Sequence, residues 1–212
     1  MAVMRLGILG GSFDPIHFGH LLVAEDVLVQ LRLDRVLFVP TFRPPHKMAT
    51  GAPYKDRVAM VRLALKGRPR FRLCPIEEKL PGPSYTVETL RWLRQRYPRA
   101  TRYLLVGADQ YRTMASWHRP WELTSLARIV VMSRPGVPKP RIYSGHSRTR
   151  VRFLDVIPVA ISAREIRDRL ASGRSVRYLI PSRVMEFIRR HRLYYPKAVP
   201  GRRLVAQTSQ ED

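Results

Sequence analysis

Two short apolar runs with a helical pattern between them open the chain. The run from Arg5 to Leu9 ends at two glycines, the run from Arg35 to Val39 ends at a proline, and both predict buried strands. Between them, apolar residues recur at helical spacing, which predicts a helix carried by Leu21, Ala24, Leu28 and Leu31. A strand, a helix and a strand in this order predict a parallel pair joined by a right-handed crossover.

The same alternation continues toward the C-terminus. Further strands are predicted at 71–74, 103–106, 128–132 and 153–156. Helices are predicted over 58–65 and 87–97 and from Ala163, and in a last helix Val184, Phe187, Ile188 and His191 share one face. This order predicts an α/β fold, a doubly wound, Rossmann-like and mainly parallel sheet with helices on both faces and a C-terminal helical segment.

The predicted fold also sets the domain organisation and the place of a ligand. Residues 1–195 are expected to form one domain, and residues 196–212 a disordered tail. The segment from Ser133 to Arg150 is rich in proline, glycine, serine and basic residues, so we expect a mobile loop there. Ligands of such sheets bind beyond the carboxyl ends of the strands, where Gly10, Pro40 and Gly107 fall.

Composition favours a soluble protein with phosphate-bearing partners. No apolar stretch reaches about 18 residues, and the N-terminus lacks signal-peptide features, so we expect a cytoplasmic location. The single cysteine, Cys74, is expected to pack in the core. A net charge of +23, from 39 basic and 16 acidic residues, favours anionic partners. The charge alone also fits a solvated arginine-rich surface or a nucleic-acid-binding module, although the aromatic residues do not gather on one predicted sheet face.

The first predicted strand leads into the sequence GGSFDPIHFGH, residues 10–20. It matches neither the Walker A loop nor the dinucleotide-binding fingerprint. His17 and His20 are three residues apart at the start of a helix, so both rings can lie on one side of its positive end and hold an anion. The alternatives are a metal site, for which the sequence offers no third ligand at the usual spacing, and two structural histidines.

A second candidate phosphate site is ISAREIR, residues 161–167. Ser162 followed by Glu165 forms a capping-box pattern, which predicts a helix that begins at Ser162 and carries Arg167 in its second turn. Helix capping alone also explains Ser162 and Glu165.

These two motifs resemble those of the HxGH nucleotidyltransferase superfamily. The resemblance implies that ATP is bound by the glycine turn and both histidines, that is by Gly10, Gly11, Ser12, Phe13, His17, Gly19 and His20. ISAREIR is similar to the ISSTxIR motif that clamps the triphosphate, which implies ATP contacts for Ser162 and Arg167, although Ala163 and Arg164 replace the usual residues. Class I aminoacyl-tRNA synthetases share a related motif, but 212 residues leave little room for a tRNA-binding domain.

Four further segments resemble the bacterial nicotinate mononucleotide adenylyltransferases: PTFRPPHK (40–47), SYTVETL (84–90), GADQ (107–110) and WHRPWEL (117–123). This resemblance implies mononucleotide contacts by Asp14, Lys47, Thr86 and Trp117, and ATP contacts by Gly107 and Asp109. Thr86 would offer donors to the pyridine carboxylate, and Trp117 would stack on the pyridinium ring. Without the resemblance, Thr86 reads as a helix cap, Trp117 as a half-buried core aromatic and Lys47 as a solvated loop residue.

The implied reaction is adenylyl transfer from ATP to nicotinate mononucleotide, which gives deamido-NAD and pyrophosphate. His17, His20 and Arg167 would be the catalytic residues, Mg²⁺ would arrive with ATP, and no resident metal is expected. ATP and the mononucleotide are the expected partners, without specific nucleic acid or membrane, and a homo-oligomer is compatible with the sequence. Alternative acceptors are nicotinamide mononucleotide and a pantetheine phosphate, the latter disfavoured by segments 84–90 and 117–123.

Overall fold

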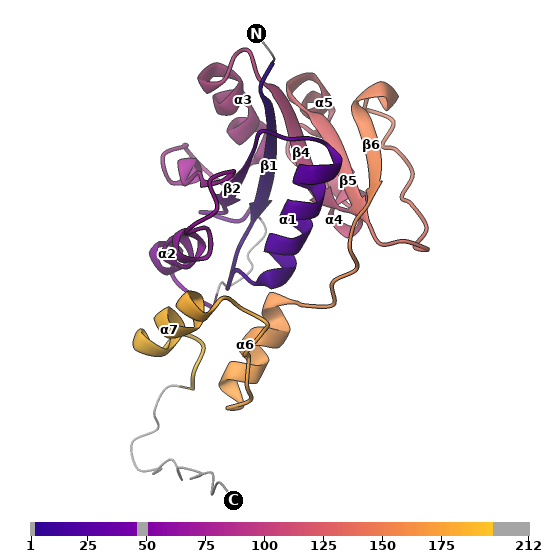
Figure 1. The fold of residues 1–212 in the computed structure, drawn as a ribbon. Helices are drawn as coiled ribbons and strands as arrows, with labels where there is room; N and C mark the ends of the chain where they lie inside the picture. The colour runs from indigo at the N-terminus through magenta and orange to yellow at the C-terminus, as the bar shows by residue number, and fades with distance from the viewer. Residues whose placement is uncertain (1–2, 46–50, 197–212) are drawn as a thin grey trace, which may run out of the picture.

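The computed structural model describes residues 3–45 and 51–196, which contain one six-stranded sheet. Figure 1 shows the ribbon of the chain. All neighbouring strands are parallel and lie in the order β3-β2-β1-β4-β5-β6. The strands are β1 (Arg5–Gly11), β2 (Arg35–Pro40), β3 (Phe71–Leu73), β4 (Thr101–Gly107), β5 (Arg128–Ser133) and β6 (Val151–Asp155). The order reverses between β1 and β4, so the ends of these two strands form the switch point where such folds bind ligands.

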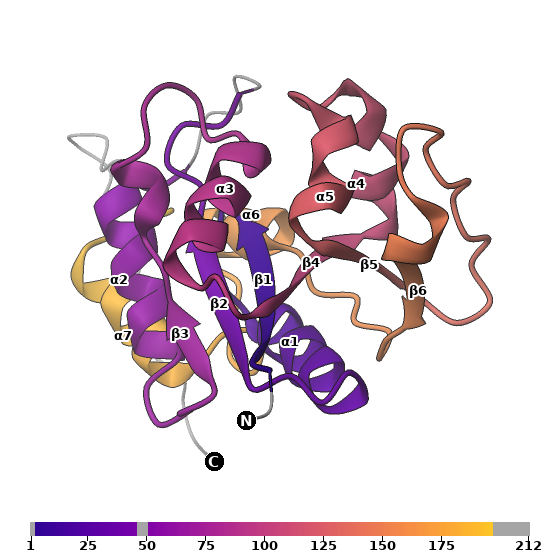
Figure 2. The ribbon, with the colours of Figure 1, turned by 90° about the horizontal axis from the view of Figure 1, so that it is seen from above.

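Helices cover both faces of the sheet, as the sequence predicted (Figure 2). One face carries α1 (Phe18–Gln30), α2 (Tyr54–Ala64), α6 (Ala163–Ala171) and α7 (Ser182–Arg190). The other face carries α3 (Thr86–Arg96), α4 (Ala108–Arg112) and α5 (Leu123–Leu126). The described part of the chain also contains four short 3₁₀ helices: η1 (Ile76–Glu78), η2 (Met114–Ser116), η3 (Pro120–Glu122) and η4 (Arg148–Arg150).

The continuous apolar runs of the strands arise because both faces are buried. In β4, Tyr103 and Leu105 belong to the core under α1, whereas Leu104 and Val106 belong to the core under α3. Successive side chains of a strand point to opposite faces, so a strand between two helical layers needs apolar residues at every position.

The chain that follows β6 crosses back from the edge of the sheet to its centre (Figure 1). Two hydrogen bonds fix its path against α1: the Ile157 amide donates to Asp26 Oδ2 at 2.8 Å, and Gln30 Nε2 donates to the Asp155 carbonyl at 3.0 Å. This return places the start of α6 near the end of β1.

The predicted elements are all present, with differences at three places. β1 runs through Gly10 and Gly11 rather than ending before them. His191 follows the last helix as its exposed C-cap and stacks on Phe187, so it is not part of the buried face formed by Val184 and Ile188. The segment 133–150, predicted to be a mobile loop, contains the end of β5, the whole of η4 and a buried histidine, His146.

Two further predictions concern the C-terminal tail and membrane-spanning helices. Residues 197–212 of the predicted tail lie outside the described residues. Within 3–45 and 51–196, every helix is too short or too polar to cross a membrane.

Candidate active site

The carboxyl ends of β1 and β4 border open space. A Cβ atom built on Gly10 or on Gly107 would meet no described atom within 4 Å. Both glycines lie at the same edge of the sheet, because Leu9 of β1 pairs with Leu105 of β4. A ligand can therefore approach the backbone closely here, because neither glycine carries a side chain.

The turn after β1 buries Phe13 and exposes Ser12. Phe13 has a positive φ of 48°, is 1% exposed, and packs with its ring centroid 5.7 Å from that of Phe38. The predicted ATP contact of Phe13 would therefore have to come from its backbone, because its side chain belongs to the core. Ser12 is exposed, so its side chain remains accessible to a ligand.

His17 and His20 form a stacked pair at the start of α1. Their ring centroids lie 3.7 Å apart with an angle of 25° between the planes. His17 is the N-cap residue, and its backbone N–H donates to His20 Nδ1 at 3.3 Å. Because Nδ1 of His20 accepts this bond, the proton of the neutral ring lies on Nε2, which is left as a donor for a ligand.

Gly19 is needed between the two histidines for steric reasons. A Cβ atom there would lie 2.9 Å from Nδ1 of His17 and 3.3 Å from Cγ1 of Val159. The HxGH spacing therefore places two rings side by side only if the residue between them has no side chain.

Both histidines are neutral at neutral pH. Burial lowers the pKa of His17 from 6.5 to about 4. Burial also lowers the pKa of His20 well below 6.5, and the neighbouring His17 lowers it further. Nδ1 of His17 is buried and has no hydrogen-bond partner among the described residues, which adds to the cost of charging the ring.

Folding stability should consequently fall in mild acid. Between pH 6.5 and about 4 the unfolded chain binds a proton on His17 that the folded chain does not, so the free energy of unfolding decreases as the pH is lowered. This contribution of His17 to the free energy of unfolding is fully present above pH 6.5. From about pH 7.5 to about pH 5 it should amount to up to about 2 kcal/mol, measured by urea unfolding. His17→Asn should lose less stability over this range than the wild type. His191→Gln, which alters an exposed histidine, should lose as much as the wild type, and equal losses in all three proteins would contradict the assignment.

The buried carboxylate of Asp14 ties two distant segments of the chain to the turn after β1. The carboxylate is 3% exposed and accepts the Gly51 amide at 2.6 Å, the Ala52 amide at 3.0 Å and the Tyr194 hydroxyl at 2.7 Å. In this structure the carboxylate oxygens of Asp14 accept bonds from the protein itself, and the mononucleotide contact of Asp14 stays a prediction.

Arg167 lies beside this junction. Its Nη1 donates to the Asp14 carbonyl at 2.7 Å and lies 3.8 Å from the Asp14 carboxylate. About a third of its side chain is exposed, at 32%. A Cβ atom on Gly51 would lie 2.8 Å from Cδ of Arg167, so Gly51 leaves room for the arginine. The structure thus brings the two predicted phosphate motifs together.

The start of α6 has the predicted cap. Ser162 is the N-cap residue, and its Oγ accepts the Glu165 amide at 3.1 Å. Arg164 points into solvent with 86% of its side chain exposed, 4.0 Å from Asp168. Arg167 is therefore the arginine of this motif that the fold turns toward the histidine loop.

Arg57, which was not predicted as a site residue, supports the same loop through its hydrogen bonds. It is 1% exposed, and its guanidinium donates to the Ser12 carbonyl at 2.5 Å and to the Thr41 carbonyl at 2.8 Å. These bonds tie the turn after β1 to the turn after β2. Nothing in the sequence around Arg57 separates it from the many exposed arginines, because its burial results from the packing of α2.

Two of the predicted mononucleotide-binding residues, Thr86 and Trp117, lie on the other face of the sheet. Thr86 is the first residue of α3, and the N-cap residue Tyr85 supplies no side-chain bond to this helix end. Tyr85 instead stacks on His118, with the ring centroids 4.1 Å apart. Trp117 is half-buried immediately before His118. The stack therefore holds the segment with Trp117 against the start of α3.

Asp109 and Lys47 are the remaining predicted site residues. Asp109 lies in the first turn of α4 with 98% of its side chain exposed and pairs with Arg112. Lys47 lies outside the described residues. Glu77, which was not predicted, is 7% exposed and accepts the Phe42 amide at 3.2 Å and the Thr89 hydroxyl at 3.1 Å, so it supports the turn after β2.

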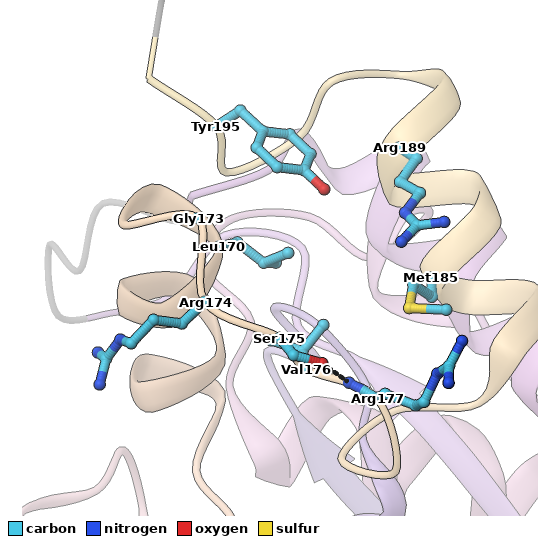
Figure 3. A pocket seen from close by; sticks show the side chains of 9 residues that line it. All are labelled: Leu170, Gly173, Arg174, Ser175, Val176, Arg177, Met185, Arg189 and Tyr195. Atoms are coloured by element: carbon cyan, nitrogen blue, oxygen red, sulfur yellow. Dashed lines mark hydrogen bonds between the residues drawn. The ribbon is translucent and has the colours of Figure 1, made fainter. Parts of the chain in front are cut away.

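A cavity of about 310 Å³ lies apart from this site, between the end of α6 and α7 (Figure 3). It is lined by Leu170, Gly173, Arg174, Ser175, Val176, Arg177, Met185, Arg189 and Tyr195. Arg174 turns away from the other lining side chains in Figure 3. The lining includes no residue predicted for the site, and the cavity lies at the opposite end of α6 from Ser162.

Sequence comparisons agree with the geometry. Residues 8–169 match the model of the cytidylyltransferase-like family. A protein of Thermus thermophilus named "Probable nicotinate-nucleotide adenylyltransferase" is 46% identical over 191 residues, which cover 90% of this chain and 100% of the relative. A protein of Thermomicrobium roseum with the same name is 44% identical over 195 residues, which cover 90% of this chain and 91% of the relative.

Solved structures share the fold. The nicotinic acid mononucleotide adenylyltransferase of Plasmodium falciparum, complexed with NaAD, superimposes with a TM-score of 0.74 at 18% identity, over 90% of this chain and 97% of that chain. A second structure of that enzyme, complexed with APC, gives a TM-score of 0.71 at 17% identity, over 90% of this chain and 97% of that chain. On the strength of the sequence matches, this chain belongs to the cytidylyltransferase-like family and, within it, to the nicotinate-nucleotide adenylyltransferases.

Proposed function

We propose that this protein transfers the adenylyl group of ATP to nicotinate mononucleotide, giving deamido-NAD and pyrophosphate. The observation that carries the proposal is the stacked, neutral histidine pair at the switch point, with Arg167 turned toward the same loop. The pair offers hydrogen-bond donors, and the arginine offers positive charge, as a triphosphate requires. The names of the relatives support this reaction.

The chemistry needs no general base. A phosphate oxygen of the mononucleotide, already ionised at neutral pH, attacks the α-phosphorus of ATP in line, a new P–O bond forms, and the bond to pyrophosphate breaks. The Nε2–H of His20 donates to the phosphate oxygens on which charge develops, and Arg167 stabilises the same charge. Catalysis then consists of positioning and charge neutralisation.

In this proposal Mg²⁺ enters the site bound to ATP. It would be held mainly by triphosphate oxygens, which suits a small cation that keeps several of its waters, and it would reduce the negative charge of the triphosphate. The Asp14 carboxylate already accepts hydrogen bonds from two amides and a hydroxyl, so we do not propose it as a ligand of Mg²⁺.

The pyridine group is assigned to the start of α3. The N-terminus of this helix carries partial positive charge and no side-chain cap, so its amides and the Thr86 hydroxyl can bind the carboxylate. Trp117, held nearby through His118, would stack on the ring. The contacts of Lys47 with the mononucleotide and of Asp109 with a ribose stay predictions, as do the cytoplasmic location and the oligomeric state.

The direct test is pyrophosphate release from ATP and Mg²⁺ by the purified protein with nicotinate mononucleotide, with nicotinamide mononucleotide or without acceptor. Release with the acid far above release with the amide supports the proposal. Release with neither acceptor refutes it, and equal release with both refutes the role given to the carboxylate.

Trp117→Ala should separate the two substrates. Loss of the stacking surface should raise the KM for nicotinate mononucleotide by about tenfold, corresponding to roughly 1–2 kcal/mol, and leave the KM for ATP nearly unchanged. Steady-state kinetics with each substrate varied in turn gives both constants. Trp121→Ala, at a more exposed tryptophan of the same segment, is the matched control and should change neither. An equal rise of both KM values in Trp117→Ala would show that Trp117 only supports the core.

A further inference from the structure

His146 is a buried histidine outside the candidate active site. It lies in the segment between β5 and β6, where a mobile loop was predicted, and is 5% exposed. The proposed reaction makes no use of it. A buried polar ring in a connecting segment is unusual enough to need a physical account, because burying imidazole without partners is costly.

Both ring nitrogens of His146 have partners, and the partners set the direction of each bond. Nε2 lies 2.9 Å from the Pro120 carbonyl, which can only accept, so Nε2 carries the proton. Nδ1 of the neutral ring is therefore an acceptor, and the Tyr111 hydroxyl donates to it at 3.1 Å. The Tyr111 oxygen in turn accepts the Tyr143 amide at 3.4 Å. Burial lowers the pKa of His146, which keeps the ring in this neutral form.

The two partners belong to the two segments that border the pyridine and ribose regions. Tyr111 lies in α4, two residues after Asp109. Pro120 begins η3, three residues after Trp117, and follows Arg119, whose φ is 51°. His146 thus connects α4 to the segment that carries Trp117.

The segment with Trp117 is held from two sides. On the side of α3, His118 stacks on Tyr85, and Arg91 pairs with Glu122 at 2.6 Å. On the side of the β5–β6 connection, His146 Nε2 donates to the Pro120 carbonyl at 2.9 Å, and the Ser147 amide donates to Thr124 Oγ1 at 3.4 Å. Trp117 comes directly before His118 and three residues before Pro120, so both attachments restrain the backbone that carries its indole.

We propose that His146 is a positioning residue that orients Trp117 for the acceptor through its bond to Pro120. The inference rests on the proposed function, since Trp117 is assigned there to the pyridine ring. His146 acts through Pro120 and does not touch a substrate. A residue that merely filled space would stabilise the fold without distinguishing one substrate from the other.

Three substitutions separate the two bonds of the ring. His146→Gln can keep an amide N–H near the position of Nε2 and so retain the bond to Pro120. His146→Asn can keep an acceptor near the position of Nδ1 and so retain the bond to Tyr111. His146→Leu fills space and retains neither.

The expected result is a change in the KM for nicotinate mononucleotide, because small displacements of a binding group have large effects. His146→Leu and His146→Asn should raise this KM by about tenfold and spare the KM for ATP, while His146→Gln stays closer to the wild type. Thr124→Val is the matched control. It removes a bond of the same segment, from the Ser147 amide to Thr124 Oγ1 at 3.4 Å, without touching Pro120, and should leave both KM values unchanged.

A second measurement needs no acceptor. In a background with Trp92→Phe and Trp121→Phe, Trp117 is the remaining tryptophan, and His146→Leu should increase the quenching of its fluorescence by acrylamide, whereas Thr124→Val should not. Absence of transfer to nicotinate mononucleotide in the wild type would refute the proposed function, and the quenching would still test the positioning. Unchanged quenching, or a lowered melting temperature with an unchanged ratio of the two KM values, would overturn the role of His146.

Discussion

His20→Asn should lower kcat for adenylyl transfer by about 10²–10³-fold, the loss typical of removing one preorganised donor from a developing negative charge. The substitution is informative because of the bond that it preserves. Asn Oδ1 can take the position of His20 Nδ1 and continue to accept the His17 amide, so the start of α1 keeps its local bond. What disappears is the Nε2 donor.

Two comparisons separate catalysis from folding. His20→Gln places an amide donor near the position of Nε2 and should recover part of the lost kcat, at the expense of the bond from the His17 amide. Loss of the ring also removes the stack with His17 and the edge contact with Phe13, so melting temperatures are needed for each variant. Near-normal kcat in folded His20→Asn would show that the histidine serves only the structure of the loop.

Arg167→Ala should lower kcat/KM for ATP by about 10²-fold or more, because it removes a charged donor beside the triphosphate motif. Arg167→Lys should recover little of the loss. A guanidinium can hold the Asp14 carbonyl with one nitrogen and present others to a phosphate, whereas an ammonium on a shorter chain cannot span both.

The control for Arg167 lies on the same helix. Arg169 pairs with Glu165 at 3.0 Å and has 34% of its side chain exposed, close to the 32% of Arg167. Arg169→Ala removes the same charge from α6 and should leave kcat/KM within about twofold, since exposed pairs of this kind contribute little. Equal losses in Arg167→Ala and Arg169→Ala would assign the effect to general electrostatic attraction of ATP by a very basic protein.

The local patterns of the chain predicted most of the fold. Buried strands and amphipathic helices appear as runs and periods of apolar residues within a few positions, so β1, α1 and β2 could be predicted from neighbouring residues. The cap at Ser162 is also local, because the donor and acceptor are three residues apart.

The placement of the two histidine rings was predictable from the local pattern, but their protonation state was not. The HxGH spacing predicted two rings on one side of a helix start, and the structure shows them stacked. Their neutral state was not predictable from the motif, because it follows from burial by elements far away in the chain, including Val159 beside Gly19.

The succession of strands and helices along the chain, the doubly wound class and the two motifs that carry the proposed chemistry were all predictable from the amino-acid sequence. The folded structure adds the partners of three polar groups. The Asp14 carboxylate accepts bonds from Gly51, Ala52 and Tyr194, and Arg57 ties two turns together. His146 anchors a segment that was predicted to be mobile. The physical reason is the same in each case. An apolar period reports burial along the chain, whereas the partner of a polar group is chosen by whichever distant backbone or side-chain atom the packing brings within hydrogen-bonding distance.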